Sequence, residues 1–276
     1  MVTSMDTERE MIAALNNSEA LRRRSVTVKY FDVTDSTNRQ AREYALSGGR
    51  GTALFVANAQ TDGRGRLGRS FYSPADTGLY MTLLLDVTED ELPSVCRITS
   101  MTAVAVVRAI QSVTGRECGI KWVNDIYCDG KKACGILSES FFAEDRRFVA
   151  VGVGINLTTE TFPEELCDVA VSLKEQGDAD LRSPLAEAVA LGILEGYSNV
   201  KAGKLTYLSD YRRLSTVIGR DVCFCRNGEW ESGVAVDIDG DGGLIVRQDG
   251  GETVTLSGGE ITLRLRDQEG DIHEKR

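Results

Sequence analysis

Residues 119–156 read GIKWVNDIYCDGKKACGILSESFFAEDRRFVAVGVGIN, and this stretch decides the fold. It contains four short, largely apolar runs, at residues 119–122, 126–128, 133–139 and 148–155. Asp129-Gly130 lies between the second and third runs and is typical of a two-residue hairpin turn. Short runs in direct succession predict neighbouring strands of one sheet.

The pattern continues upstream and downstream of this stretch. Further strand-like runs lie at residues 26–31, 52–59 and 79–85. Helical segments are predicted at residues 5–21, 36–46, 93–113 and 184–216, the last interrupted near Gly203. Strands with helices grouped around them predict an α+β domain, in which a mixed or antiparallel sheet is covered by helices on one face.

The composition changes at Gly219. Five short strand-like runs follow, at residues 222–224, 231–236, 243–247, 253–256 and 261–265. Turn residues separate them, at Asn227-Gly228 and in the Asp/Gly-rich residues 239–243 and 249–251. This spacing predicts a small β-barrel. We therefore expect an N-terminal extension at residues 1–25, a large domain at 26–218, the barrel at 219–266 and a charged tail at 267–276.

The chain of 276 residues has a formal net charge of −10, so any basic surface must be local. A protein that grips a nucleic-acid backbone usually carries net positive charge, and this balance argues against nucleic acid as the main partner. No run of about 18 apolar residues is available to span a membrane. Residues 1–24 lack the apolar stretch of a secretory signal, so we expect no membrane partner.

The cysteine and histidine content excludes several kinds of site. The seven cysteines are odd in number and form no Cys-x-x-Cys pair, and the one histidine, His273, lies in the charged tail. A disulfide scaffold, a zinc site and a Ser-His-Asp triad are therefore not expected. We expect reduced thiols in the cytoplasm and no metal held by the protein itself.

An arginine/glycine loop, Gly63-Arg64-Gly65-Arg66-Leu67-Gly68-Arg69, follows a predicted strand. Glycines let the backbone approach a ligand closely, and arginine guanidinium groups match the geometry of phosphates and carboxylates. The pattern favours a mobile loop that closes over an anion, and a solvated turn is the alternative. It is not a Walker A loop, because no Gly-Lys-Ser/Thr follows.

The start of the helix predicted at residues 36–46 has two interpretations. Thr37 with Gln40 fits a capping box, Thr-x-x-Gln, which would serve the helix alone. Hydroxyl groups and helix-terminal N–H groups also suit the polar head of a ligand. Both interpretations can hold at once.

Two lysines and one strand are also candidates for a binding site. Lys121 ends a predicted strand, where it could neutralise a developing negative charge or be an exposed edge lysine. Lys132 is a second cationic position, or part of a hairpin turn. Gly152 and Gly154 lie inside a strand that ends at Asn156, which predicts close approach of a ligand or backbone, or tight sheet packing.

With these motifs in this order, the sequence closely resembles the biotin–protein ligase family. The matching motifs are Asp35-Ser36-Thr37-Asn38, Gln60 with Gly63-Arg64-Gly65-Arg66, Gly78-Leu79-Tyr80, Lys121-Trp122-x-Asn124-Asp125, Lys132 with Gly135-Ile136-Leu137 and Glu139, and Gly152-x-Gly154-Ile155-Asn156. The resemblance covers residues 26–266, and its last part, with Ser257-Gly258-Gly259-Glu260, is similar to the family's SH3-like C-terminal domain. It implies that residues 26–218 are the catalytic ligase domain.

The resemblance implies a two-step reaction. The carboxylate of biotin attacks the α-phosphate of Mg-ATP, giving biotinyl-5′-AMP and pyrophosphate. A lysine of a biotin carboxyl carrier domain, part of a biotin-dependent carboxylase, then attacks the mixed anhydride and releases AMP. Because no covalent enzyme intermediate is needed, catalysis consists of positioning and charge neutralisation, and Mg²⁺ arrives with ATP.

By position, the resemblance assigns catalytic roles to Lys121, Arg64 and Arg66. The residues implied to bind biotin are Ser36, Thr37, Asn38, Gln60, Arg64, Gly65, Arg66 and Lys121. Those implied to bind ATP are Arg66, Arg69, Asn124, Lys132 and Asn156. Lys121 would contact the carboxylate and acyl-phosphate oxygens.

Three positions depart from the family pattern. Leu67 replaces the arginine usual in the centre of the loop, Phe71 replaces a tryptophan and Val123 replaces a proline. Leu67 removes a charge from the loop, so retention of the adenylate is expected to be weaker. Members that also repress transcription carry an N-terminal winged-helix domain, for which the 25 residues before the first predicted strand are too few. We expect a ligase that does not bind operator DNA, as a monomer or homodimer.

Three alternatives compete with this interpretation. A lipoate–protein ligase shares the catalytic architecture, but the Arg-Arg-x-Ser-Gly-Gly-Gly loop and downstream histidine of those enzymes are absent. A biotin-sensing DNA-binding repressor is disfavoured by the net charge and by the short N-terminal extension. A catalytically idle module would bind biotin without making biotinyl-AMP.

Overall fold

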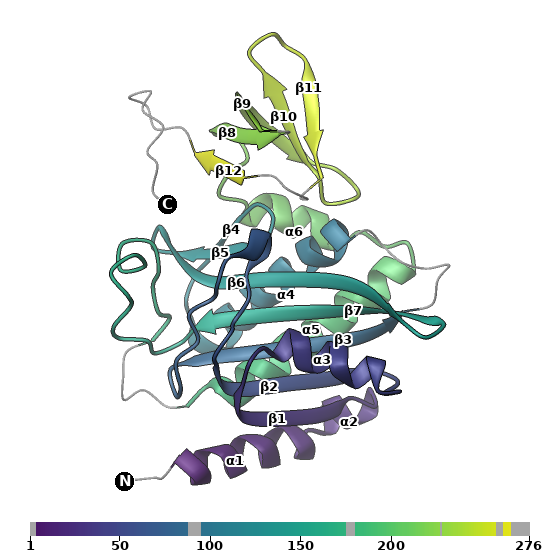
Figure 1. Cartoon of the computed structure of the whole chain (residues 1–276). Coiled ribbons are helices and arrows are strands. Elements are labelled where there is room, and N and C mark those ends of the chain that lie inside the picture. Colours follow the sequence, from purple (N-terminus) through teal and green to yellow (C-terminus); the bar gives the residue numbers. More distant parts are fainter. Residues whose placement is uncertain (1–3, 88–94, 175–179, 227, 258–261, 266–276) are drawn as a thin grey trace.

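A seven-stranded mixed sheet forms the larger part of the molecule (Figure 1). The computed structural model describes residues 4–87, 95–174, 180–226, 228–257 and 262–265. The strands of this sheet are β1 (Thr27–Thr34), β2 (Ala53–Gln60), β3 (Gly78–Val87), β4 (Gly119–Lys121), β5 (Asp125–Cys128), β6 (Lys131–Ala143) and β7 (Arg146–Asn156). Their spatial order is β1-β2-β3-β7-β6-β5-β4, in which β1 and β2 run parallel and the other neighbours run antiparallel.

The four strands predicted within residues 119–156 are confirmed as β4 to β7. β6 and β7 are longer than predicted and pair without interruption from Cys134↔Ile155 to Ala143↔Arg146. The extension follows from the alternation at the end of β6, where Phe141 and Ala143 are buried and Phe142 between them is exposed. These four strands form one half of the sheet and carry most of one wall of the site described below.

Helices lie on both faces of this sheet, so the prediction that they cover one face is wrong (Figure 1). On one face, α4 (Val95–Thr114) and α5 (Arg182–Lys201) contact each other and pack in a large hydrophobic core that includes Leu83 and Val151. On the other face, α3 (Thr37–Leu46) packs on Leu84 and Phe148, the alternate residues of the sheet. α3 covers only part of this second face, and the remainder lines a cavity.

A second sheet follows α6 (Tyr207–Leu214). It contains β8 (Asp221–Arg226), β9 (Glu229–Ile238), β10 (Leu244–Gln248), β11 (Thr253–Leu256) and β12 (Thr262–Leu265), in the antiparallel order β11-β10-β9-β8-β12. The five predicted strands are confirmed. Other predicted features lie outside the described residues: the helix start at residues 93–94, Asn227 of one turn, residues 258–260 of the terminal motif, and the tail with His273.

The N-terminal helix predicted at residues 5–21 is two helices, α1 (Ser4–Asn17) and α2 (Glu19–Arg23). The break falls at Ser18, whose hydroxyl accepts a hydrogen bond from the Leu21 N–H at 3.1 Å and caps α2. Met11, Leu15 and Leu21 are buried in the main core. Among the described helices, none has the length and apolar character needed to cross a membrane.

Candidate functional site

A cavity of about 560 Å³ opens on the α3 face of the seven-stranded sheet. The twelve residues that the resemblance assigns to biotin or ATP all line it: Ser36, Thr37, Asn38, Gln60, Arg64, Gly65, Arg66, Arg69, Lys121, Asn124, Lys132 and Asn156. Its lining residues include five arginines and lysines and one carboxylate, Asp125, in a chain of net charge −10. The cavity therefore concentrates positive charge and suits an anionic ligand.

The wall formed by β6 and β7 has glycines where side chains from other elements press against it. A Cβ atom at Gly152 would lie 2.3 Å from Asn38 Oδ1, and one at Gly154 would lie 2.6 Å from the Phe71 ring. The close approach predicted for these glycines is thus made by Asn38 and Phe71, two side chains of this chain. A Cβ atom at Gly135 on β6 would lie 3.3 Å from the same ring. Phe71 therefore covers the central strands beside the cavity.

The first turn of α3 is part of a polar network, and the predicted Thr37–Gln40 capping box is wrong. Ser36 is the N-cap, and its side chain makes no capping hydrogen bond. The Thr37 N–H and hydroxyl both donate to Gln60 Oε1, at 2.9 and 3.2 Å. Gln60 Nε2 donates in turn to Ser73 Oγ at 3.0 Å. The end of β2 thus replaces Gln40 as the partner of this helix start, because the fold brings Gln60 beside it.

A second branch of this network joins α3 to residues of β3 and β6. The buried Thr82 hydroxyl lies 2.8 Å from Thr37 Oγ1 and 2.6 Å from Asn38 Oδ1. Asn38 Nδ2 donates to Glu139 Oε2 at 2.7 Å. Neither Thr82 nor the link to Glu139 was predicted from the sequence, because each depends on sheet register and not on local pattern. The network fixes the orientation of the hydroxyl and amide groups that border the cavity.

The arginine/glycine loop folds back on itself at the mouth of the cavity. An antiparallel bridge joins Arg64 to Ser70, and the Gly65 N–H donates to the Arg69 carbonyl at 2.7 Å. Leu67 has a φ of 58° and is about half exposed. Arg66 points inward, where its Nη1 donates to Asn124 Oδ1 at 3.1 Å. Burial lowers the pKa of Arg66 below its usual value, because the charged guanidinium loses part of its hydration. A bound anion would stabilise the charge of such a guanidinium.

An ion-pair chain connects this loop to α3. Asp62 Oδ2 lies 2.7 Å from Arg39 Nη2 and 3.6 Å from Arg64 Nη2. Arg39 also pairs with Asp35, which precedes the helix. Since these groups are partly or largely exposed, the linked ion pairs contribute little to stability, but they restrict where the Arg64 guanidinium can lie.

Lys121 lies beside an aromatic hydroxyl on the next strand. Its ammonium donates to the Tyr127 hydroxyl at 3.5 Å and lies 5.3 Å from the centre of that ring. Burial, with a smaller contribution from Asp125, raises the pKa of Tyr127 to about 12, so the phenol stays neutral near pH 7. Tyr127 therefore orients Lys121 without neutralising it. Lys132 pairs with Asp125 at 2.6 Å.

One wall of the cavity was not predicted from the sequence. Phe162, Leu166, Val169 and Ala170 line it, within a segment that has no helix or strand. Its position depends on pairing with Lys132, whose N–H donates to the Val169 carbonyl at 2.8 Å. No periodic pattern marks such a segment, so the only local signal was its position directly after β7.

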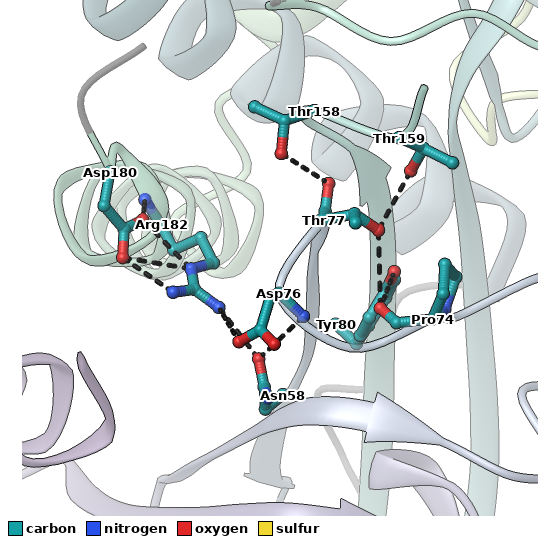
Figure 2. Close-up of polar contacts among 9 residues, drawn as sticks. All are labelled: Asn58, Pro74, Asp76, Thr77, Tyr80, Thr158, Thr159, Asp180 and Arg182. Atoms are coloured by element: carbon teal, nitrogen blue, oxygen red, sulfur yellow. Dashed lines mark hydrogen bonds and ion pairs between the residues drawn. The ribbon is translucent and has the colours of Figure 1, made fainter. Parts of the chain in front are cut away.

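A polar network also holds the segment that links the loop to β3 (Figure 2). Arg182, buried at the start of α5, donates to Asn58 Oδ1 of β2 at 2.8 Å. The same oxygen accepts a hydrogen bond from the Asp76 N–H at 3.1 Å. The Thr77 carbonyl accepts one from the Thr158 N–H at 2.7 Å. Residues 76–77 are thereby attached both to β2 and to the residues that follow β7, and both strands border the cavity.

Gly152→Ala is expected to displace Asn38, because the new methyl group would occupy the position of its side-chain oxygen. We expect a loss of about 1–3 kcal/mol in the free energy of unfolding and weaker ligand binding. Urea denaturation of the wild type, Gly152→Ala, Asn38→Ala and the double variant measures this loss of stability. In the Asn38→Ala background the same glycine substitution should cost much less. Equal costs in both backgrounds would show that Asn38 is not what the methyl group displaces.

The arrangement can bind an anionic ligand and stabilise negative charge, and it offers no metal cluster. In the described part of the chain, no group of three or more His, Cys, Asp or Glu side chains could hold a metal ion. Lys121, Arg66 and Arg64 line the same cavity from two different parts of the chain, so a negatively charged ligand there would have cationic groups from both parts available to it. Stabilisation of developing negative charge by such fixed groups is a strong catalytic effect.

Known proteins match the chain in both of its parts. Residues 30–156 match the Biotin/lipoate A/B protein ligase family, and residues 217–264 match the Biotin protein ligase C terminal domain. The biotin–[acetyl-CoA-carboxylase] ligase of Mycobacterium tuberculosis is 30% identical over 234 residues, which cover 83% of this chain and 85% of that protein.

Two further comparisons add to this. The bifunctional ligase/repressor BirA of Bacillus subtilis is 42% identical over 151 residues, which are 53% of this chain and 46% of that protein. The match thus spans about half the length of that relative. The solved structure of the biotin protein ligase from Aquifex aeolicus in complex with biotin and ATP superposes with a TM-score of 0.75 at 26% identity, covering 87% of this chain and 99% of that chain.

Proposed function

This chain belongs to the biotin protein ligase family, and on that premise we propose that it is an ATP-dependent ligase that attaches biotin to a carrier protein. The observation that supports this most is the single cavity that gathers all twelve candidate residues and five cationic side chains. Biotin carries a carboxylate and ATP carries phosphates, so two anions must be brought together in one place. A cavity of this charge offsets their mutual repulsion.

In the first proposed step, a carboxylate oxygen of biotin attacks the α-phosphorus of Mg-ATP. The bond between that phosphorus and the bridging oxygen breaks, and pyrophosphate leaves. Ser36, Thr37, Asn38 and Gln60 would hold the ring of biotin, and Lys121, Arg64, Gly65 and Arg66 would enclose the carboxylate and the α-phosphate. Arg69, Asn124, Lys132 and Asn156 would contact the remainder of the nucleotide. Mg²⁺ would enter as part of the Mg-ATP substrate.

In the second proposed step, the ε-amine of a lysine on a biotin carboxyl carrier domain attacks the acyl carbon of biotinyl-5′-AMP. The amine loses a proton, an amide forms and AMP leaves. The protein partner would thus be a carrier domain, with no nucleic acid or membrane involved, and the setting would be the cytoplasm. We propose a monomer or homodimer for the working form.

The test is pyrophosphate–ATP exchange with biotin or lipoate as the acid. Exchange with biotin and none above background with lipoate is the expected result. Exchange that prefers lipoate would instead make the chain a lipoate–protein ligase. A mass increase of one biotinyl group on a carrier domain tests the second step. Biotin binding without exchange would mean that the chain is a binding module and not an enzyme.

A further inference from the structure

The two residues that flank Lys121 are both held by the C-terminal part of the chain. Before it, the Ile120 carbonyl accepts hydrogen bonds from Thr216 N–H at 2.8 Å and Thr216 Oγ1 at 3.2 Å. After it, the indole N–H of Trp122 donates to the Gly242 carbonyl at 2.9 Å. Thr216 lies directly before the second sheet, and Gly242 lies in the turn between β9 and β10. The cavity lysine therefore sits between two attachments to a different part of the molecule.

The turn that provides Gly242 is shaped for this contact. Asp239 Oδ1 accepts hydrogen bonds from the N–H groups of Asp241 and Gly243, both at 2.8 Å, and closes the turn. Gly242 is buried with a φ of 84°, a conformation that favours glycine. A Cβ atom there would lie 2.6 Å from Ser100 Oγ and 3.0 Å from the Cys96 carbonyl oxygen of α4. The turn can therefore reach Trp122 only without a side chain at this position.

Further contacts of the turn fix it against α4. The Cys96 thiol donates to the Gly242 carbonyl at 3.1 Å, and Arg97 Nη2 pairs with Asp241 Oδ1 at 2.5 Å. The Trp122 side chain is buried and also lines the cavity. Its position, and with it the backbone of the β4–β5 turn, depends on where the Gly242 carbonyl lies.

We propose that the turn at residues 239–243 of the C-terminal sheet positions Lys121 for the reaction, through the hydrogen bond that the Trp122 indole donates to the Gly242 carbonyl. Gly242 and Trp122 are positioning residues in this scheme, and Lys121 is the group that meets the substrates. The inference rests on the proposed ligase function. It adds that adenylate formation depends on a contact with the second sheet, some 120 residues along the chain from Trp122.

The test compares Gly242→Ala with Gly251→Ala in the full chain. Gly251 has a φ of 87° in the same sheet, and a Cβ atom there would meet nothing within 4 Å. Both variants carry the same backbone strain, and only the first pushes the turn away from α4 and Trp122. We expect Gly242→Ala to lower kcat for biotin-dependent pyrophosphate exchange by about ten- to hundredfold with little change in the KM for biotin. Gly251→Ala should stay near the wild type.

A spectroscopic measurement tests the contact separately from activity. The chain has two tryptophans, Trp122 and Trp230, so Trp230→Phe leaves Trp122 as the single reporter. In that background, Gly242→Ala should shift the emission of Trp122 to longer wavelength, and Gly251→Ala should not. An emission shift with unchanged kcat would overturn the proposal, as would the absence of a shift.

A further variant keeps the test decisive if Gly242→Ala does not fold. Trp122→Phe removes the indole donor and keeps an aromatic ring, although a smaller one, and we expect kcat to fall by about tenfold at similar KM. An unchanged kcat would overturn the proposal. If the wild type itself shows no biotin-dependent exchange, the proposed function fails, and the emission comparison still reports whether the turn holds Trp122.

Discussion

Lys121→Met is expected to slow the formation of biotinyl-5′-AMP by about 10²–10³-fold, the range found when one fixed charge-stabilising group is removed from an active site. The proposed first step would bring a carboxylate against a phosphate, and negative charge would build on the oxygens between them. Lys121 on β4 lines the cavity together with residues of the arginine/glycine loop, and its ammonium donates to the neutral Tyr127 hydroxyl. Methionine keeps most of the side-chain volume and removes the charge together with the hydrogen-bond donors of the ammonium.

Single-turnover release of pyrophosphate, at saturating biotin and ATP, measures this step directly. Lys131→Met is the matched control, because Lys131 begins strand β6 of the same sheet, donates to the Cys167 carbonyl at 3.0 Å and is outside the cavity lining. It should behave as the wild type does. If Lys121→Met releases pyrophosphate at nearly the wild-type rate, Lys121 is not a catalytic residue. The arginines of the loop would then stabilise the developing charge.

The strands within residues 119–156 could be predicted because each has its own local pattern. The same holds for the five short strands after Gly219, where Asn-Gly or Asp/Gly turns mark three of the four boundaries between them. The face that α3 covers could not be predicted in this way. α3 buries only two apolar residues, Ala41 and Ala45, so its pattern is too weak to show which side of the sheet it meets.

In the candidate site, too, the local motifs could be predicted and the long-range contacts could not. Its twelve predicted residues come from short motifs and were found in one cavity. Their partners were not predicted, because these depend on contacts between distant parts of the chain: Thr82 is 45 residues from Thr37, and Glu139 is 101 residues from Asn38. The capping-box prediction failed for the same reason, since Gln60 is the nearer partner of Thr37 in space although Gln40 is nearer in sequence. The roles of these residues toward biotin and ATP stay predictions.

Arg182→Met is expected to lower the free energy of unfolding by about 1.5–3 kcal/mol, because it removes a buried guanidinium that donates hydrogen bonds to Asn58 and to the partly exposed Asp180. Arg182 is buried and pairs with Asp180 at 2.8 Å, and it donates to Asn58 at the same distance. Chemical denaturation measures the loss. Arg213→Met is the control, since Arg213 pairs with Asp210 at 2.9 Å on an exposed helix surface and should lose less than about 1 kcal/mol.

The pH dependence of this loss tests whether Asp180 carries it. Partial burial would raise the pKa of Asp180, but its hydrogen bonds from Arg182 outweigh burial and hold the pKa below the ordinary value of 3.8. The pair therefore stabilises the protein above that value, and the contribution is lost as the pH falls through the lower folded pKa. In Arg182→Met the backbone N–H of residue 182 can still donate to Asp180, but the side-chain hydrogen bonds and the positive charge are lost, so ionised Asp180 stabilises the variant less. The difference in unfolding free energy between the two proteins should thus be smaller at a pH below 3.8 than at pH 6. A difference that stays constant with pH would mean that Arg182 stabilises the fold through Asn58 and packing, and not through its carboxylate partner.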